Sequence, residues 1–293
     1  MASLLVNVKS KMAIYAHEKV RGVLEGEYGS VFKGRSMDFD DLREYIPGDD
    51  VKDIDWKATA RSGSTLIRRY IAIRKHNIML VVDTGRNMSA VAADGNSKKQ
   101  IAVLLAGVMT TLALKHGDLI GLVSGNKDRS KYLPLKTGHV HAEQVLQEID
   151  KSIREDSPNS NIASQLEYLA RNIRLKMIVV VISDETPFDE TLSSVVRRLR
   201  AQHEILWLRI ADADLTSENN LSDIENMSDE LPAFIRNSKV VVKSYKEAEE
   251  AERLNFSQAL NRLAISSERV NSEAEAVSKV YRLLERHRSA RRA

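Results

Sequence analysis

The chain has 293 residues, of which 43% are hydrophobic and 29% are charged, and it contains no cysteine. This length allows one large domain with an extension or two small domains, and the hydrophobic content is sufficient for a full-sized core. The lack of cysteine excludes disulfides, thiolate metal sites and a cysteine nucleophile. The net charge of +3 is too small to indicate nucleic acid as a partner.

No segment of the sequence suggests export or membrane insertion. The first residues lack the long apolar core of a signal peptide. The longest apolar run, residues 101–114, is shorter than the ~20 residues that a spanning helix needs. We therefore expect a cytoplasmic protein without a membrane span.

We interpret residues 1–76 as an N-terminal extension and residues 77–293 as the main domain with C-terminal helices. Within the extension, residues 34–61 mix carboxylates and bases with a Pro-Gly turn and aromatic side chains. A solvated loop would not need a tryptophan, so we expect Arg and Asp to pair at fixed geometry and to order this segment against the main domain. A solvated loop or a binding face remains the alternative. The residues expected to serve structure here are Arg43, Asp49, Asp50, Asp55, Trp56 and Arg61.

The main domain alternates between two patterns, and the pattern predicts a doubly wound, mostly parallel α/β sheet. Continuous apolar runs, typical of strands buried on both faces, occur at residues 78–82, 119–123, 177–182 and 205–210. Helical spacing of apolar residues occurs between them at 101–112, 142–153, 162–173 and 192–199. The first of these helices is preceded by a capping-box pattern, Ser97 to Gln100, and is followed by Gly117.

The flanking segments are less regular. Residues 64–74 read as an additional strand, for which antiparallel pairing with residues 78–82 is one arrangement. Residues 239–245 read as a short peripheral strand. A helix is expected from 247 to 261, a break at 266–267, and a further helix from 273.

Two of the predicted strands end in aspartate, at Asp83 and at Asp184. In an open parallel sheet, ligands bind beyond the carboxyl ends of the strands, so the two carboxylates are candidate Mg²⁺ ligands. The alternative is that both aspartates cap the following turns or helices. The Asp-Thr-Gly at 83–85 also matches an aspartic protease signature, but that chemistry needs a second such carboxylate on a β-rich lobe, and the sequence has no second match.

The motif around Asp83 resembles a von Willebrand factor A domain: an apolar strand, Asp-x-x-x-x-Met at 83–88, an amphipathic helix, Gly-Asp-x-x-Gly-Leu at 117–122, and Ile-Ser-Asp at 182–184. The block before it is similar to the signature of the bacterial family called domain of unknown function 58. The matching residues are Gly34, Phe39, 42–45, 47–50, 54–56 and 60–61. The resemblance covers roughly residues 20–210. It implies a von Willebrand A-like fold and a MoxR-type AAA+ ATPase as partner.

Compared with the Asp-x-Ser-x-Ser metal pattern of von Willebrand A domains, this sequence has lost ligands. Asp83 and Asp184 match the two aspartates, Gly85 replaces the first serine, and Asn87 replaces the second. The threonine position falls near residues 160–161, where Asn161 could instead cap a helix. The expected metal site is therefore Asp83, Asn87 and Asp184 in degenerate form, with weak or absent Mg²⁺ binding and no other cofactor.

We expect a non-enzymatic protein-interaction module, an adaptor or partner of a MoxR-type ATPase that remodels or matures other proteins. The alternative is a Mg²⁺-dependent hydrolase using Asp83 and Asp184, for which no general base or nucleophile is identifiable. The expected partner-binding residues, in the loops at the carboxyl ends of the strands, are Arg86, Asn161 and Glu185. Arg86 could instead neutralise Asp83 or Asp184. A nucleic-acid role for the basic C-terminal tail is disfavoured, because no aromatic stacking partners accompany it.

Overall fold

The computed structural model describes residues 3–18, 37–72, 75–213 and 239–290. The chain forms two compact units, one made of residues 1–31 with 77–293 and the other of residues 32–76. The interpretation of residues 1–76 as one extension therefore needs correction at its start. Helix α1 (Leu4–Glu18) packs on α4 (Lys98–Lys115) and α5 (His139–Ser152) of the larger unit, because its apolar side chains at Leu5 and Val8 are buried there.

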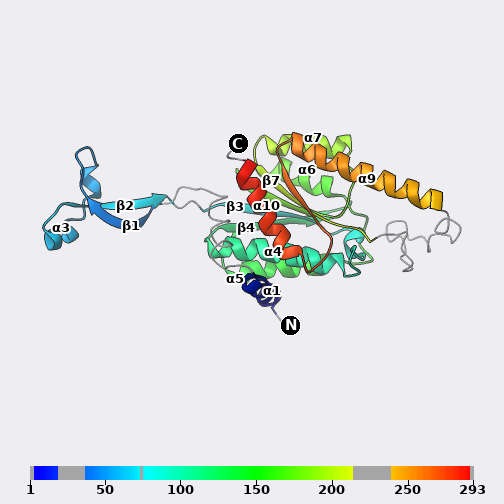
Figure 1. Cartoon of the computed structure of the whole chain (residues 1–293), viewed down its shortest axis with the longest axis horizontal. Coiled ribbons are helices and arrows are strands. Elements are labelled where there is room, and N and C mark those ends of the chain that lie inside the picture. The colour runs from blue at the N-terminus through cyan, green and yellow to red at the C-terminus, as the bar shows by residue number, and fades with distance from the viewer. Residues whose placement is uncertain (1–2, 19–36, 73–74, 214–238, 291–293) are drawn as a thin grey trace. The chain divides into compact units, whose positions relative to one another are not determined.

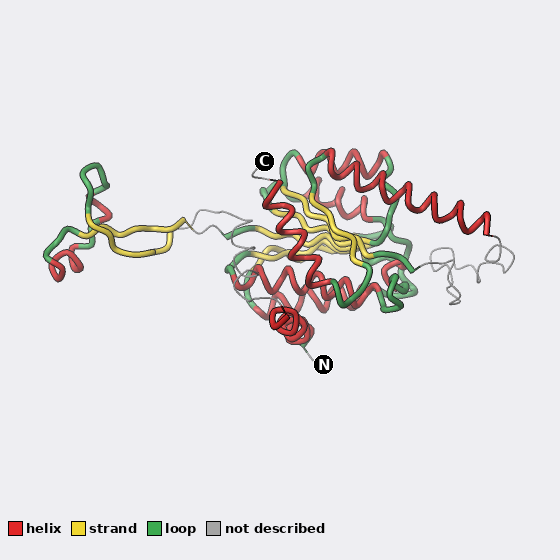
Figure 2. The backbone as a smooth tube through the Cα atoms, viewed as in Figure 1, coloured by secondary structure: helices red, strands yellow, loops and turns green. Residues whose placement is uncertain are grey.

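The larger unit is built on a six-stranded sheet with the order β5-β4-β3-β6-β7-β8 (Figures 1 and 2). All neighbouring strands pair in parallel except β5 with β4. This topology confirms the predicted doubly wound, mostly parallel sheet. The strands are β3 (Asn77–Asp83), β4 (Leu119–Gly125), β5 (Ser130–Lys136), β6 (Ile178–Ser183), β7 (Glu204–Ile210) and β8 (Ser266–Val270).

Helices cover both faces of this sheet. Figure 1 shows α1, α4 and α5 on one side, and α6 (Ile162–Asn172), α7 (Glu190–Arg200) and α9 (Lys239–Arg262) on the other. The last helix, α10 (Ala276–Ala290), contacts α4 and β8. The central strands carry apolar residues on both faces for this reason.

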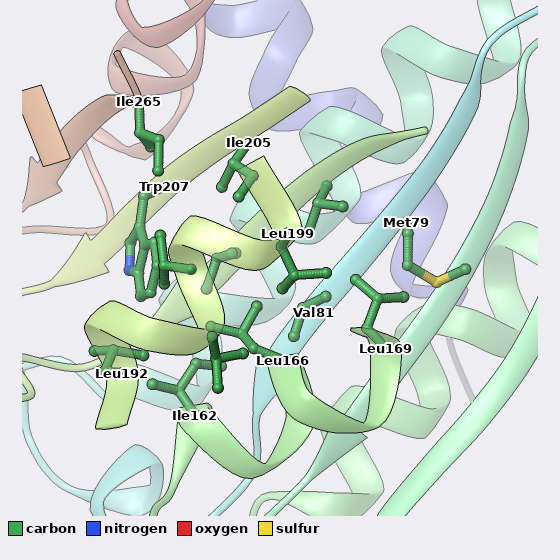
Figure 3. Packing of buried hydrophobic residues seen from close by; sticks show 14 of the residues in the cluster. Met79, Val81, Ile162, Leu166, Leu169, Leu192, Leu199, Ile205, Trp207 and Ile265 are labelled. Atoms are coloured by element: carbon green, nitrogen blue, oxygen red, sulfur yellow. The ribbon is translucent and has the colours of Figure 1, made fainter. Parts of the chain in front are cut away.

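One half of the core lies between the sheet and helices α6, α7 and α9, where alternate side chains of each strand point to the same face. Met79 and Val81 of β3 lie on the face of the sheet that α6 covers, in the same cluster as Leu166 of α6 (Figure 3). Trp207 of β7 packs edge-on against Phe256 of α9, with ring centroids 5.5 Å apart. The Trp207 indole donates to the Ser183 hydroxyl at 3.0 Å, which satisfies the buried N–H.

The flanking segments differ from three expectations. Residues 66–72 form a strand, β2 (Leu66–Ala72), but it pairs antiparallel with β1 (Met37–Glu44) in the smaller unit and not with β3. Residues 239–245 form the first turns of α9 and not a strand. The residues that follow them are charged and have high helix propensity, and the helix that they form includes this exposed segment at its N-terminal end. The expected break at 266–267 is the edge strand β8.

Two further details correct the sequence reading. Strand β5 was not predicted, because its alternating exposed pattern is weaker than that of the buried strands. Ser97 does precede α4, but its side chain makes no capping hydrogen bond. Gly117 ends that region as expected, with a positive φ of 71°.

The smaller unit is an antiparallel hairpin of β1 and β2 whose connection is itself structured. The connection holds a 3₁₀ turn, η1 (Val51–Asp53), and a short helix, α3 (Trp56–Ser62), which ends at Gly63 with a φ of 79°. Ile54 forms a bridge to Ile67 of β2, so the connection is hydrogen-bonded back onto the hairpin.

Candidate functional site

Asp83 and Asp184 lie side by side at the carboxyl edge of the sheet, because β3 and β6 are neighbouring parallel strands. Both side chains are buried, with exposures of 0% and 2%. Asp83 accepts the Gly85 N–H at 2.8 Å, and Asp184 accepts the Thr186 hydroxyl at 2.9 Å. Each aspartate therefore stabilises the turn that follows its strand and also faces the other carboxyl group.

The burial of Asp83 has a strong electrostatic consequence. Desolvation, followed by repulsion from Asp184, raises the pKa of Asp83 to about 8. The backbone N–H of Gly85 and the Lys98 ammonium act in the opposite direction. At neutral pH the folded protein therefore favours a protonated Asp83 beside Asp184.

Lys98 is the cation of this site, and its side chain is almost completely buried, at 1% exposure. Its ammonium forms an ion pair with Asp212, which follows β7. Partial desolvation raises the pKa of Asp212 above its ordinary value, although Lys98 acts in the opposite direction and the Asp212 side chain is 43% exposed. Asp83, Asp184 and Asp212 thus place carboxyl groups at the ends of three adjacent strands around one lysine.

Sequence reasoning missed Lys98 and Asp212. A lysine at the start of an amphipathic helix ordinarily reads as a solvent-exposed residue. Asp212 lies in a loop that follows a strand without an aspartate at its end. The strand order, which places β7 next to β6, brings Asp212 to the site, and Lys98 reaches it from the start of α4.

Three buried oxygen atoms at this edge have no hydrogen-bond partner among the described residues. They are Oδ2 of Asp83, Oδ1 of Asn87 and Oγ of Ser160. Carboxylate, amide and hydroxyl oxygens are the donors that Mg²⁺ accepts. These atoms and the Asp184 carboxyl group fit a hard cation, which would relieve the repulsion between the two aspartates. Within the described ranges, however, no three His, Asp or Glu side chains gather as a metal-binding group.

Gly85 limits the site for a steric reason. A Cβ atom at this position would lie 2.3 Å from Cα and 2.4 Å from N of Ser160. Both atoms are backbone, so a side chain at residue 85 would require the loop that carries Ser160 to move. The serine of the usual metal pattern is therefore incompatible with the loop as it is packed here.

The three expected partner-binding residues each have an internal partner. Arg86 is half-buried and donates from Nε to the Ser157 carbonyl at 3.2 Å, while its N–H bonds the Pro158 carbonyl at 2.9 Å. Asn161 caps α6 by accepting the Ser164 N–H at 3.2 Å. These contacts give Arg86 and Asn161 roles in holding the loop that precedes α6.

Glu185 forms a bidentate ion pair with Arg269 of β8, at 2.7 and 2.8 Å. Burial alone would raise the pKa of Glu185, but the Arg269 hydrogen bonds bring it below its ordinary value. The pair links the loop after β6 to the edge strand across β7. Its two parallel hydrogen bonds fix the position of this loop relative to β8.

Residues 34–61, here called the signature segment, contain Arg–Asp pairs that are internal to the smaller unit, whereas we expected them to order the segment against the main domain. Arg43 donates to both carboxylate oxygens of Asp49 at 2.8 and 2.7 Å, and these hydrogen bonds hold the pKa of Asp49 below its ordinary value. Asp49 also accepts the Ile46 N–H at 3.0 Å. Asp50 accepts the Lys52 N–H at 3.0 Å and so caps the 3₁₀ turn. These contacts lie entirely within the smaller unit.

The start of α3 is fixed by Asp55. Its Oδ1 accepts the N–H groups of Lys57 and Ala58, both at 3.0 Å, and its Oδ2 accepts Arg68 Nε at 3.0 Å. The hydrogen bond from Ala58, then that from Arg68, lowers the pKa of Asp55. Arg61 donates to the Lys57 carbonyl at 3.1 Å within the helix.

Trp56 differs from the other members of the signature segment. Its side chain is 65% exposed, so it is not the packed aromatic residue that we expected to order this segment. Ile46 and Val51 are also exposed in the same connection, at 59% and 58%. The ion pairs and caps hold the backbone, and the apolar side chains remain on the surface.

Comparison with known proteins gives a family and distant structural neighbours. The chain matches the family described as "Protein of unknown function DUF58" over residues 41–260. It is 30% identical over 199 residues to uncharacterized protein Mb1516 of Mycobacterium bovis and, with the same figures, to uncharacterized protein Rv1480 of Mycobacterium tuberculosis. The match covers 67% of this chain and spans 61% of the length of these relatives.

Two solved structures are similar over most of the chain. An aerotolerance-related membrane protein from Bacteroides fragilis is 15% identical, with a TM-score of 0.45, over 71% of this chain and 98% of that chain. A von Willebrand factor type A protein from Catenulispora acidiphila is 9% identical, with a TM-score of 0.44, over 75% of this chain and 44% of that chain. In the part of the chain that the structure describes, no helix has the length and apolar character needed to cross a membrane.

Proposed function

The chain belongs to the family described as protein of unknown function DUF58, and we propose that it is a non-enzymatic protein-interaction module with a von Willebrand A-type sheet. Its partner in this proposal is a MoxR-type AAA+ ATPase, for which the protein acts as an adaptor in remodelling or maturation of other proteins. The observation that carries the proposal is the exposure of Trp56 on an internally ordered connection.

An exposed tryptophan suits an interface for a physical reason. Tryptophan and arginine are enriched among the residues that contribute most to protein–protein binding, and a rigid backbone reduces the entropy lost on association. Here the Asp55 cap and the Arg43–Asp49 pair hold the backbone on either side of the apolar residues. The connection thus presents Trp56, Ile46 and Val51 without needing to order them at the moment of binding.

Burial at the carboxyl edge of the sheet favours binding over catalysis. A catalytic group has to reach its substrate, whereas Asp83, Asp184 and Lys98 are all at most 2% exposed. Each of the three also has a structural role, because Lys98 forms an ion pair with Asp212 and the two aspartates accept hydrogen bonds within the turns that follow their strands. The hydrolase alternative would require this edge to open before any substrate could contact the two aspartates.

The proposal is tested by direct binding of the purified protein to the MoxR-type ATPase of the same genome, by biolayer interferometry with and without ATP. We expect Trp56→Ala to weaken binding at least about tenfold, as for a central interface tryptophan. The matched control is Leu175→Ala, which truncates an apolar side chain of the larger unit that is 54% exposed. This variant should bind as the wild type does. Absence of binding by the wild type in both nucleotide conditions would refute the partner. Equal binding by the wild type and Trp56→Ala would refute the surface.

A further inference from the structure

A polar cavity of about 400 Å³ lies beside the site, at the carboxyl end of β4. It is bounded by the β4–β5 turn, the end of α5 and the loop at 154–158. Its volume falls within the range of small-molecule pockets. Its charged lining residues are Arg129, Lys131, Glu148, Lys151, Arg154 and Asp156.

The cavity carries an excess of positive charge. Lys131 pairs with Glu148 at 2.7 Å, and Arg154 pairs with Asp156 through two hydrogen bonds at 2.8 and 2.6 Å. These pairs use both acidic residues of the lining. The remaining two bases, Arg129 and Lys151, make no ion pair with any residue that the structure describes.

Arg129 lies on a turn whose backbone is held by hydrogen bonds to Asn126 and Gln165. Asn126 Oδ1 accepts the N–H groups of Asp128 and Arg129 at 3.1 and 3.3 Å. The buried Gln165 of α6 donates to the Asn126 carbonyl at 2.9 Å. A Cβ at Gly125 would lie 2.2 Å from the Arg129 carbonyl oxygen, which shows how closely the turn packs on β4. The fold therefore fixes the backbone that carries the exposed Arg129 side chain.

The lining indicates the chemical class of the ligand. Apart from Pro158 and Gly125, every lining side chain is charged or carries a hydroxyl or amide group. No aromatic ring lines the cavity, so a nucleobase would find nothing to stack on. We propose that this cavity binds a compact, multiply charged phosphate anion, as inorganic pyrophosphate or the phosphate group of a small phosphorylated metabolite, between Arg129 and Lys151.

Such a ligand would act on the neighbouring site through the shared loop. Ser157 and Pro158 line the cavity and also accept the two hydrogen bonds from Arg86. Ser160, two residues further, packs against Gly85 beside Asp83. An anion in the cavity therefore stabilises the loop that shapes the carboxyl edge of the sheet. This inference does not depend on the proposed ATPase partner.

The test is calorimetric titration of the full chain with phosphate, pyrophosphate, ribose 5-phosphate and ATP at constant ionic strength. We expect saturable binding of pyrophosphate or ribose 5-phosphate, weakened at least about tenfold in Arg129→Gln/Lys151→Gln, since each lost base removes charge-assisted hydrogen bonds to phosphate. Arg171→Gln removes an exposed base of α6 that pairs with Glu167, and it should leave the affinity unchanged. Tighter binding of pyrophosphate than of ribose 5-phosphate would identify the inorganic anion as the ligand, and the reverse order would identify the metabolite.

Hydrogen exchange of the wild type, with and without the tightest-binding anion, locates the site without any substitution. Protection is expected at the 126–131 turn and the 154–158 loop. The proposal is refuted if none of the anions binds saturably at millimolar concentration, or if ATP binds more tightly than both compact anions. It is also refuted if protection appears elsewhere, or if the folded double variant, checked by circular dichroism, binds as the wild type.

Discussion

Replacing Asp83 by asparagine should make the protein more stable at neutral pH, although the change removes a buried carboxyl group. The pKa of Asp83 is about 8 in the folded protein, against 3.8 for a free aspartate side chain. Between these two pH values the folded state holds one proton more than the unfolded state, so its stability falls as the pH rises. The slope for one proton is about 1.4 kcal/mol per pH unit.

An asparagine side chain at this position would resemble the protonated acid in shape and would not titrate. The free energies of unfolding of wild type and Asp83→Asn should therefore converge only below about pH 4, where the unfolded wild type is protonated as well. From pH 5 to pH 7, a rise of two units, the stability of the variant relative to the wild type should increase by about 3 kcal/mol. Urea unfolding in the presence of EDTA measures this difference. The unfolding transition is followed by the fluorescence of Trp207, which is fully buried in the larger unit.

A control separates this effect from the general pH dependence of the fold. Asp156→Asn changes a carboxylate whose side chain is 68% exposed and should give a profile parallel to that of the wild type. The reasoning is refuted if the Asp83→Asn profile is also parallel to the wild type between pH 5 and pH 7. A variant that is less stable at both pH values would show that the ionised carboxylate is required for folding.

Three further outcomes are expected. Calorimetric titration with Mg²⁺ and Mn²⁺ at pH 7 should give only weak binding, which strengthens above pH 8 as Asp83 ionises; micromolar affinity at pH 7 that disappears in Asp83→Ala would contradict this. Gly85→Ser, which restores the serine of the metal pattern, should destabilise the fold by about 1–3 kcal/mol, because its Cβ would overlap Ser160, and thermal melting at or above the wild-type temperature would show that the loop can move. Asp55→Ala should reduce the hydrogen-exchange protection of α3, whereas Trp56→Ala should not, because only Asp55 caps the helix; equal loss in both variants would assign Trp56 a structural role.

Several features of the fold could be predicted because they depend on local pattern. The buried strands of a parallel sheet need apolar side chains on both faces, and the runs at 78–82 and 177–182 report this directly. The flanking strands carried a weaker signal. Residues 66–72 were correctly recognised as a strand, but their partner, β1, could not be identified from periodicity, since pairing is a long-range property.

At the site, the aspartates were found because each ends an apolar strand, and the missing ligand at Gly85 was visible by comparison with the serine pattern. The burial of Lys98 was not predicted, because a lysine at the start of a helix ordinarily lies on the surface. The exposure of Trp56 was also not predictable, since composition alone favours burial of a tryptophan among paired charges.

The alternation of strands and helices, the two aspartates at strand ends, and the paired Arg and Asp residues of the signature segment can all be recognised in the sequence alone. Side-chain periodicity and hydrogen-bonding capacity are local properties, so they can be read along the chain. The neighbouring positions of β3, β6 and β7 became known from the three-dimensional fold, because strand order is set by crossover connections and not by any one segment. That order brings the buried Asp83 and Asp184 together and places the partly exposed Asp212 nearby, and low solvation and repulsion from Asp184 raise the pKa of Asp83.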